Sequence, residues 1–146
     1  MRVRPATDRD LPAIVELGRR FHACSGEAVA YDVNSADATA RGLMQMGFVL
    51  LAEAGEGPVG MIGVAVVPMF FNYARTLAQE LMWWVDEDGR SAGTALALLR
   101  AAEAEARARG ACRLQMIALA SSPPHVARLY ERLGYQHRET AFSKDL

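Results

Sequence analysis

The chain has 146 residues, of which 51% are apolar, so its length and composition fit one domain with a single sizeable core. Its 16 basic and 17 acidic residues give a formal net charge of −1, which argues against nucleic acid or an anionic membrane as a partner. The 2 cysteines and 3 histidines are scattered without metal-ligand spacing, so we expect no metal site. With no signal peptide in view, we expect a cytoplasmic protein.

The first third of the chain predicts one strand and two helices. Residues 1–6 predict a short strand, and Thr7 with Asp10 three positions later predicts a capped helix start. This helix should run to about Ala23, because apolar residues recur at helical spacing at Leu11, Ile14, Leu17 and Phe21. The residues expected to bound the second helix are Asn34 or Ser35 at its start and Gly47 at its end.

Three strands should follow as an antiparallel meander. They are predicted at residues 48–53, 59–67 and 79–86, the first of them as a continuous apolar run typical of a buried strand. Pro68 is expected to end or bulge the second strand. Residues 72–77 are interpreted as a connection.

The rest of the chain alternates helices and strands. The predicted elements are a helix from Gly93 to Gly110, a strand at 112–119, a helix capped by Ser122 and ended by Gly134, and short strands at 135–139 and 141–144. The unit from 79 to 119 should be a parallel strand-helix-strand crossover. The order β-α-α-β-β-β-α-β-α-β-β over residues 1–146 predicts a single α/β domain with a mixed sheet and helices on both faces.

Residues 88–95 are the segment that most directly suggests chemistry. They lie between a predicted strand and a helix N-terminus, where free backbone N–H groups and the positive end of the helix dipole converge. Small side chains let an anion approach the backbone, and Arg90 adds a guanidinium, so the segment suits a pyrophosphate. It matches neither the Walker loop nor the three-glycine dinucleotide fingerprint. A turn whose glycines serve only the fold is the alternative.

Two motifs together resemble the GCN5-related N-acetyltransferase (GNAT) superfamily. Val85 with residues 90–95 resembles its arginine-x-x-glycine-x-glycine/alanine signature, which binds the pyrophosphate of CoA. Residues 127–135 resemble its alanine-x-leucine-tyrosine-glutamate-x-x-glycine-aromatic segment, and the predicted strand order matches the family's. Three positions depart from the common pattern: Glu87 replaces proline, Ser91 replaces glycine and Pro123 replaces asparagine.

The resemblance implies an acyltransferase that uses acetyl-CoA as co-substrate, without a metal. An amine would attack the acetyl group directly in a ternary complex, and the acceptor would be a small-molecule amine or a protein amino group. The resemblance also implies strands that diverge beside Trp83–Val85. The cofactor-binding residues that it implies are Trp83, Trp84, Val85, Arg90, Ser91, Ala92, Gly93, Thr94 and Ala95.

The resemblance also implies two candidates for proton transfer. Glu80 is the candidate general base, acting through a water, and the alternative is a carboxylate that faces solvent at a strand end. Tyr130 is the candidate acid for the leaving CoA thiolate, and the alternative is a core tyrosine on an apolar helix face. If the strand is regular, Trp83 and Trp84 should point to opposite sides of the sheet.

Two other functions fit the same fold. One is a catalytically silent acyl-CoA-binding module. The other is an interaction protein that pairs through strand edges or through the apolar patch at residues 69–71. A homodimer is the base-rate expectation for the oligomeric state.

Overall fold

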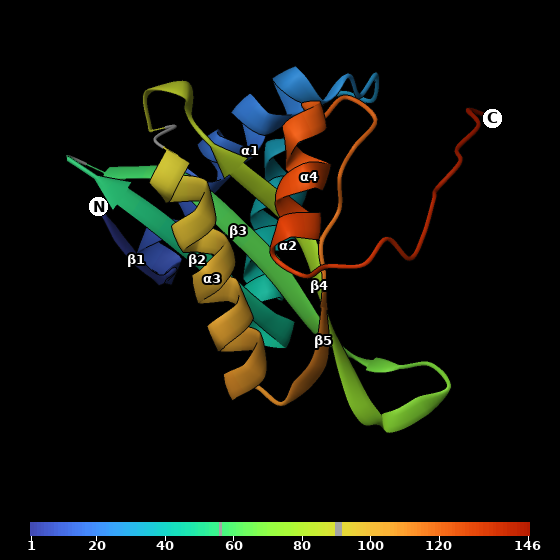
Figure 1. Cartoon of the computed structure of the whole chain (residues 1–146). Coiled ribbons are helices and arrows are strands. Elements are labelled where there is room, and N and C mark those ends of the chain that lie inside the picture. The colour runs from blue at the N-terminus through green and yellow to red at the C-terminus, as the bar shows by residue number, and fades with distance from the viewer. Residues whose placement is uncertain (56, 90–91) are drawn as a thin grey trace.

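In the computed structural model, which describes residues 1–55, 57–89 and 92–146, a mixed five-stranded sheet is flanked by four α-helices (Figure 1). The strands are β1 (Arg2–Pro5), β2 (Gly47–Ala54), β3 (Gly57–Met69), β4 (Asn72–Val85) and β5 (Ala111–Gln115). The helices are α1 (Leu11–Ser25), α2 (Val33–Met46), α3 (Ala92–Ala108) and α4 (Pro124–Arg132), with short 3₁₀ turns η1 (Asp8–Asp10) and η2 (Glu87–Gly89). Within the described ranges, no helix has the length and apolar character needed to cross a membrane.

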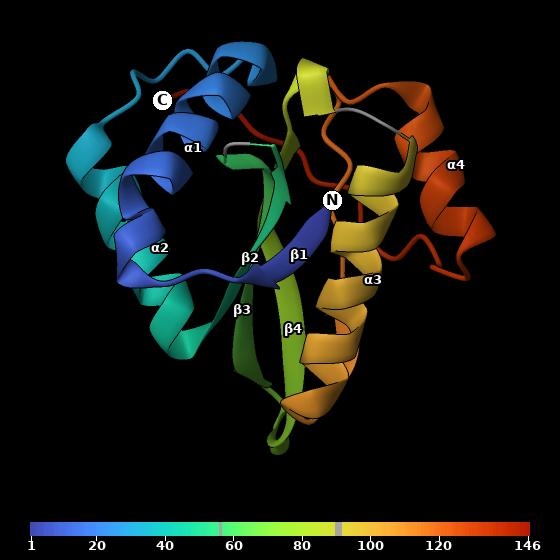
Figure 2. The same cartoon turned by 90° about the vertical axis from the view of Figure 1, so that its left-hand side faces the viewer.

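The strands lie in the order β1-β2-β3-β4-β5, antiparallel up to β4, with β5 parallel to β4. Helices α1 and α2 cover one face of this sheet, and α3 and α4 lie on the other (Figure 2). Successive side chains of β2 feed both cores: Leu51 packs with α1 and α2, whereas Leu50 packs with α3. Because both faces of β2 are buried, its sequence is a continuous apolar run, as predicted.

The predicted Thr7–Asp10 pairing forms, but it caps the 3₁₀ turn η1, because α1 begins at Leu11 with Asp10 at its N-cap. The Asp10 carboxylate accepts hydrogen bonds from the backbone N–H of Thr7 at 2.8 Å and from its hydroxyl at 2.9 Å, which confirms the predicted pairing. For α2, the prediction of Asn34 or Ser35 as cap is wrong. Asp32 caps the helix, and its carboxylate accepts from the Ser35 N–H at 2.8 Å. A carboxylate one turn earlier is a stronger acceptor for the free N–H groups than a hydroxyl.

Strand β4 is longer than predicted and β5 is shorter. Residues 72–77 form the first half of β4 rather than a connection, with Thr76 paired to Pro68 of β3. The apolar alternation that signals a strand is missing there because this half of β4 is largely exposed. Strand β5 ends at Gln115, four residues before the predicted end.

The C-terminal region also differs from prediction. Residues 135–139 and 141–144 do not form the two predicted strands, and the chain beyond α4 runs without regular structure. Their side chains are mostly exposed, so apolar burial does not hold these residues in a sheet. The predicted cap Ser122 is also wrong: Pro123 occupies that position, and the Ser122 hydroxyl accepts from the Leu119 N–H at 3.0 Å.

Beyond their neighbours, β3 and β4 continue as a two-stranded ribbon that projects from the body (Figure 1). Pairing with β2 begins only at Ala65, and pairing with β5 begins only at Thr76. The ribbon carries Phe70 and Phe71 at its tip, with exposed fractions of 87% and 70%. The register shifts at Pro68, as its missing N–H predicts.

Gly47 allows α2 to pass directly into β2. A Cβ atom at this position would lie 1.9 Å from the carbonyl oxygen of Val64 on β3, so no other residue fits without displacing the strand. The sharp junction therefore depends on close approach of two backbones, which only glycine permits.

Candidate active site

The candidate site lies where β4 and β5 part. Pairing between these two parallel strands ends at Gln79 and Gln115, whereas pairing between β3 and β4 continues to Val85. The predicted divergence of the strands beside Trp83–Val85 is therefore confirmed. A groove of about 1270 Å³ follows β5 and the residues after it, lined also by α3, α4 and the segment beyond α4.

A bulge in β4 sets which of its residues lie on the face of the sheet that α3 covers. Val64 pairs with Glu80 and Gly63 with Met82, so Leu81 is one extra residue in the strand. Val64 belongs to the core under α3, and directly paired residues share a face of the sheet, so Glu80 lies on the α3 face. Trp83 packs against the same core. Without the bulge, residues at this odd spacing would point to opposite faces.

Glu80 is buried, with only 6% of its surface exposed. Its carboxylate accepts a hydrogen bond from the backbone N–H of Ile117 at 3.0 Å. Burial raises the pKa of Glu80 to about 7, although the bond from Ile117 acts in the opposite direction. The alternative of a solvent-facing carboxylate is therefore wrong. A carboxyl group with this pKa exchanges protons readily at neutral pH, as a general base must.

Tyr130 reaches the same backbone unit from α4. It is 7% exposed, and its hydroxyl donates a hydrogen bond to the Ile117 carbonyl oxygen at 3.0 Å. Its ring packs against those of Trp83 and Tyr135, at centroid distances of 5.9 Å and 5.6 Å. Burial, followed by the charges of Glu80 and Tyr135, raises the pKa of Tyr130 well above its ordinary value. The phenol therefore keeps its proton at neutral pH and can act as a donor.

Glu80 and Tyr130 thus meet at one peptide segment from two different elements. Glu80 accepts a hydrogen bond from the N–H of Ile117, and Tyr130 donates one to its C=O. Both side chains therefore contact the segment that follows β5. The fold therefore brings together a buried candidate proton acceptor and a buried candidate proton donor. The sequence alone only suggested that they act at one site.

The two tryptophans occupy opposite faces, as predicted. Trp83 packs on the α3 face, and its buried Nε1 has no hydrogen-bond acceptor among the described residues. Trp84 packs on the α1 and α2 face, edge-on to Phe21 with centroids 6.2 Å apart, and its Nε1 donates to Asp86 at 2.8 Å. Consecutive residues of one strand therefore serve different cores.

The predicted cofactor loop is partly described. Val85 ends β4 in a buried position and Thr94 is 3% exposed in the first turn of α3. Ala95 packs against the core, whereas Gly93 is exposed. The predicted ligands Arg90 and Ser91 lie outside the described residues, and of Ala92 only its place at the start of α3 is described.

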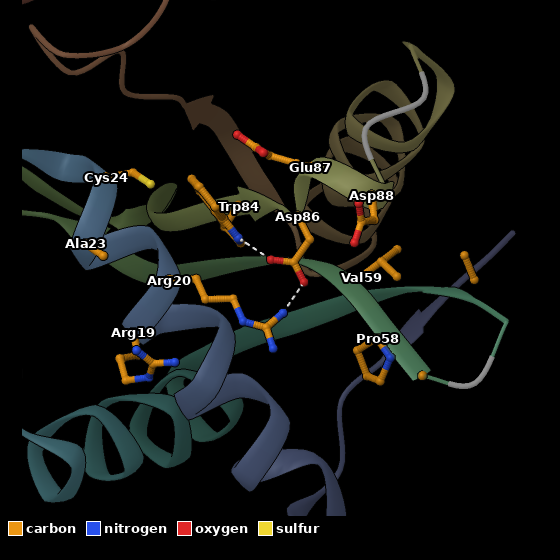
Figure 3. Close-up of a pocket in the computed structure, with 12 residues that line it drawn as sticks. Arg19, Arg20, Ala23, Cys24, Pro58, Val59, Trp84, Asp86, Glu87 and Asp88 are labelled. Carbon is orange, nitrogen blue, oxygen red and sulfur yellow. Dashed lines mark hydrogen bonds and ion pairs between the residues drawn. The ribbon is translucent and has the colours of Figure 1, made fainter.

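A second hollow, of about 960 Å³, lies on the α1 side of the sheet (Figure 3). Its lining includes Arg20 of α1, Trp84 near the end of β4 and Asp86, the residue that follows β4. Sequence reasoning did not single out Arg20 or Asp86. Their only signal is opposite charge, and 66 positions separate them, so spacing along the chain does not reveal the contact.

Comparison with known proteins agrees with this geometry. The sequence model of the acetyltransferase (GNAT) family matches residues 13–135. No curated protein gives a significant match. The chain belongs to the GNAT acetyltransferase family and is an acyltransferase.

Solved structures show the same fold. A putative acetyltransferase from Agrobacterium tumefaciens str. C58 has a TM-score of 0.76 and 21% identity, covering 100% of both chains. A predicted acetyltransferase from Clostridium acetobutylicum, solved with acetyl-CoA, has a TM-score of 0.79 and 16% identity, covering 99% of this chain and 95% of that one. A ribosomal-protein-alanine N-acetyltransferase from Brucella melitensis biovar Abortus 2308 has a TM-score of 0.75 and 18% identity, covering 100% of both chains. At these identities the similarity concerns the fold alone.

Proposed function

We propose that this chain transfers the acetyl group of acetyl-CoA to a primary amine by direct attack in a ternary complex. The observation that carries the proposal is the buried Glu80 carboxyl, with a pKa near 7, at the point where β4 and β5 separate. Burial disfavours the charged form of a carboxylate, so a purely structural carboxylate gains nothing from it. A general base that must be deprotonated yet reactive at neutral pH benefits from it.

The residues present fit acetyl-CoA as a co-substrate. The N-terminus of α3, a helix of 17 residues, follows the loop, and the groove along β5 gives an extended thioester room beside Tyr130. We assign the pyrophosphate to residues 90–95 and the arm that carries the acetyl group to the opening where β4 and β5 stop pairing. The indole N–H of Trp83 is a buried donor that a ligand carbonyl could satisfy.

The proton balance then follows from the two buried groups. The ammonium form of the acceptor loses one proton to Glu80 through a water, and the free amine nitrogen forms a bond to the acetyl carbon. The carbon–sulfur bond breaks, and the Tyr130 phenol gives its proton to the departing thiolate. The second proton, which the nitrogen loses as the amide forms, passes to the Tyr130 oxygen and restores the phenol. Among the described residues, Glu80 and Tyr130 meet at Ile117 as the pair with the required protonation states. The acceptor class is a small-molecule amine or a protein amino group.

Titration calorimetry with acetyl-CoA, followed by release of free CoA thiol against a broad panel of amines, tests the proposal. We expect binding, and thiol release that depends on one class of amine. Absence of binding at millimolar acetyl-CoA would contradict the cofactor assignment. Binding without thiol release for any amine would favour a silent CoA-binding module.

A further inference from the structure

Asp86, the first residue after β4, is held by four hydrogen bonds. Its backbone N–H donates to the Val59 carbonyl oxygen at 2.8 Å, and its own carbonyl accepts from the Gly89 N–H at 2.9 Å. Its carboxylate accepts from Trp84 Nε1 at 2.8 Å and from the guanidinium of Arg20 (Figure 3). Both the backbone and the side chain of this residue are therefore fixed.

The turn that follows Asp86 is also tightly packed. Gly89 ends η2 in a buried position, and a Cβ atom there would lie 2.7 Å from the Cβ of Val59. Residues 86–89 therefore pack against Val59 of β3, immediately before the predicted pyrophosphate-binding segment. The direction in which the chain leaves β4 depends on how firmly Asp86 is held.

Of these four partners, Arg20 alone belongs to an α-helix. That helix is α1, on the face of the sheet opposite to α3 (Figure 3). The Arg20 guanidinium also donates to Glu16 one turn earlier at 3.1 Å, so it spans from α1 to the end of β4. The Asp86 side chain is 16% exposed, which makes this charge-assisted bond less screened than an ordinary surface pair.

We propose that Arg20 is a positioning residue for acetyl-CoA binding: it anchors Asp86 and thereby holds the turn at residues 86–89, which precedes α3, in the orientation that acetyl-CoA binding requires. The inference rests on the proposed function in one respect, that this chain binds acetyl-CoA. Arg20 acts through Asp86 and does not touch the cofactor. Affinity for acetyl-CoA should therefore depend on a side chain from α1.

The neighbouring Arg19 offers a matched control. Both arginines pair with Glu16, and their side chains are similarly exposed, at 56% for Arg19 and 46% for Arg20. Only Arg20 reaches Asp86. Calorimetry should show that Arg20→Ala raises the Kd for acetyl-CoA about tenfold, the usual effect of losing one charge-assisted hydrogen bond. Arg19→Ala should leave this Kd unchanged.

The steady-state kinetics separate positioning from general destabilisation. For Arg20→Ala, the KM for acetyl-CoA should rise while kcat at saturating acetyl-CoA stays within about twofold. Arg20→Lys should recover part of the affinity, because an ammonium keeps the charge but not the planar fork. If Arg20→Ala does not fold, Arg20→Gln gives the same comparison with a longer side chain. A fall in kcat with unchanged KM would overturn the proposal.

A double-mutant cycle with Asp86→Asn identifies the route of the effect. If Arg20 acts through Asp86, the double variant should bind acetyl-CoA no more weakly than Arg20→Ala alone. Additive losses would mean that Arg20 contacts the cofactor directly, and tighter binding by Asp86→Asn would mean that Asp86 acts by repelling phosphate. Either result overturns the proposal. If the unaltered chain binds acetyl-CoA and Arg20→Ala binds it equally well, only this inference is rejected. If the unaltered chain does not bind acetyl-CoA, the proposed function is rejected.

Discussion

The two edges of β4 differ in a way that separates scaffold from site. Along β3, β4 is paired from its first residue to Val85, and from Ala78 onward apolar residues pack on both faces of that pairing. Along β5, only residues 76–79 are paired, and the next residue is the buried Glu80. On the first edge the backbone groups satisfy one another. On the second edge, a carboxylate takes over the Ile117 N–H where the ladder stops.

This contrast shows how one strand can carry both stability and chemistry. The β3 edge fixes where Glu80 and Trp83 sit, because the bulge at Leu81 is held in register on both sides. The β5 edge provides room and backbone partners for groups that change protonation. If the distinction is correct, changes at the open edge should affect binding and rate more than folding.

The largest effect is expected at the loop. Gly93 is exposed in the first turn of α3, so Gly93→Trp should leave the fold intact while its side chain blocks approach of an anion to the backbone. We expect no detectable binding in calorimetry at millimolar acetyl-CoA. Preserved affinity in a folded variant would mean that the cofactor lies elsewhere.

The next effect is on the chemical step. Glu80→Gln keeps an acceptor for the Ile117 N–H but removes the base, so kcat should fall about 10²–10⁴-fold. In the unaltered chain the rate should rise with pH through about 7, because only the ionised carboxylate accepts a proton. The variant should lose this rise, and its Kd for acetyl-CoA should not change. A variant with the same pH profile as the unaltered chain would exclude Glu80 as the base.

Glu80 should also make folding stability depend on pH. Its pKa is raised in the folded state, so the neutral form is favoured there. The contribution is fully present below the unfolded pKa of about 4.5 and is lost as pH rises through about 7. The loss in free energy of unfolding is on the order of 3 kcal/mol. Urea titrations at pH 5 and pH 8 should show this difference for the unaltered chain and a much smaller one for Glu80→Gln.

A smaller effect is expected at Tyr130. Tyr130→Phe removes the hydroxyl that donates to Ile117, so kcat should fall about tenfold while acetyl-CoA affinity stays nearly intact. A thiolate of modest basicity can leave unaided, which limits the loss. Tyr135→Phe is the matched control, because that hydroxyl donates to Glu103 instead. Equal rates for Tyr130→Phe and the unaltered chain would return Tyr130 to a packing role.

Local patterns in the sequence predicted much of this architecture. The buried run of β2, the Thr7–Asp10 pairing and the helix that begins near Gly93 are encoded over a few neighbouring residues, and the sequence predicts each of them. These patterns also singled out two candidates, Tyr130 through the second motif and Glu80 on the strand before the loop. What they did not give was the common partner, because Ile117 is connected to both only in three dimensions.

The features that were missed depend on distant or non-periodic contacts. The first half of β4 is exposed and polar, so pairing with β3 rather than its own pattern makes it a strand. The bulge at Leu81 has no glycine or proline to mark it. The Arg20–Asp86 contact joins residues 66 positions apart. The two C-terminal strands predicted at residues 135–139 and 141–144 do not form, and most of these residues are exposed in the structure.

The position of Ile117 gives the molecule an internal spectroscopic reporter. This residue lies outside β5, so its amide would ordinarily exchange with solvent quickly, yet its N–H is bonded to a buried carboxylate. The amide resonance of Ile117 should therefore shift as Glu80 gains or loses its proton, and its exchange with deuterium should be slow. A single nuclear magnetic resonance signal could thus follow the charge of the proposed base, in the resting protein and as ligands are added.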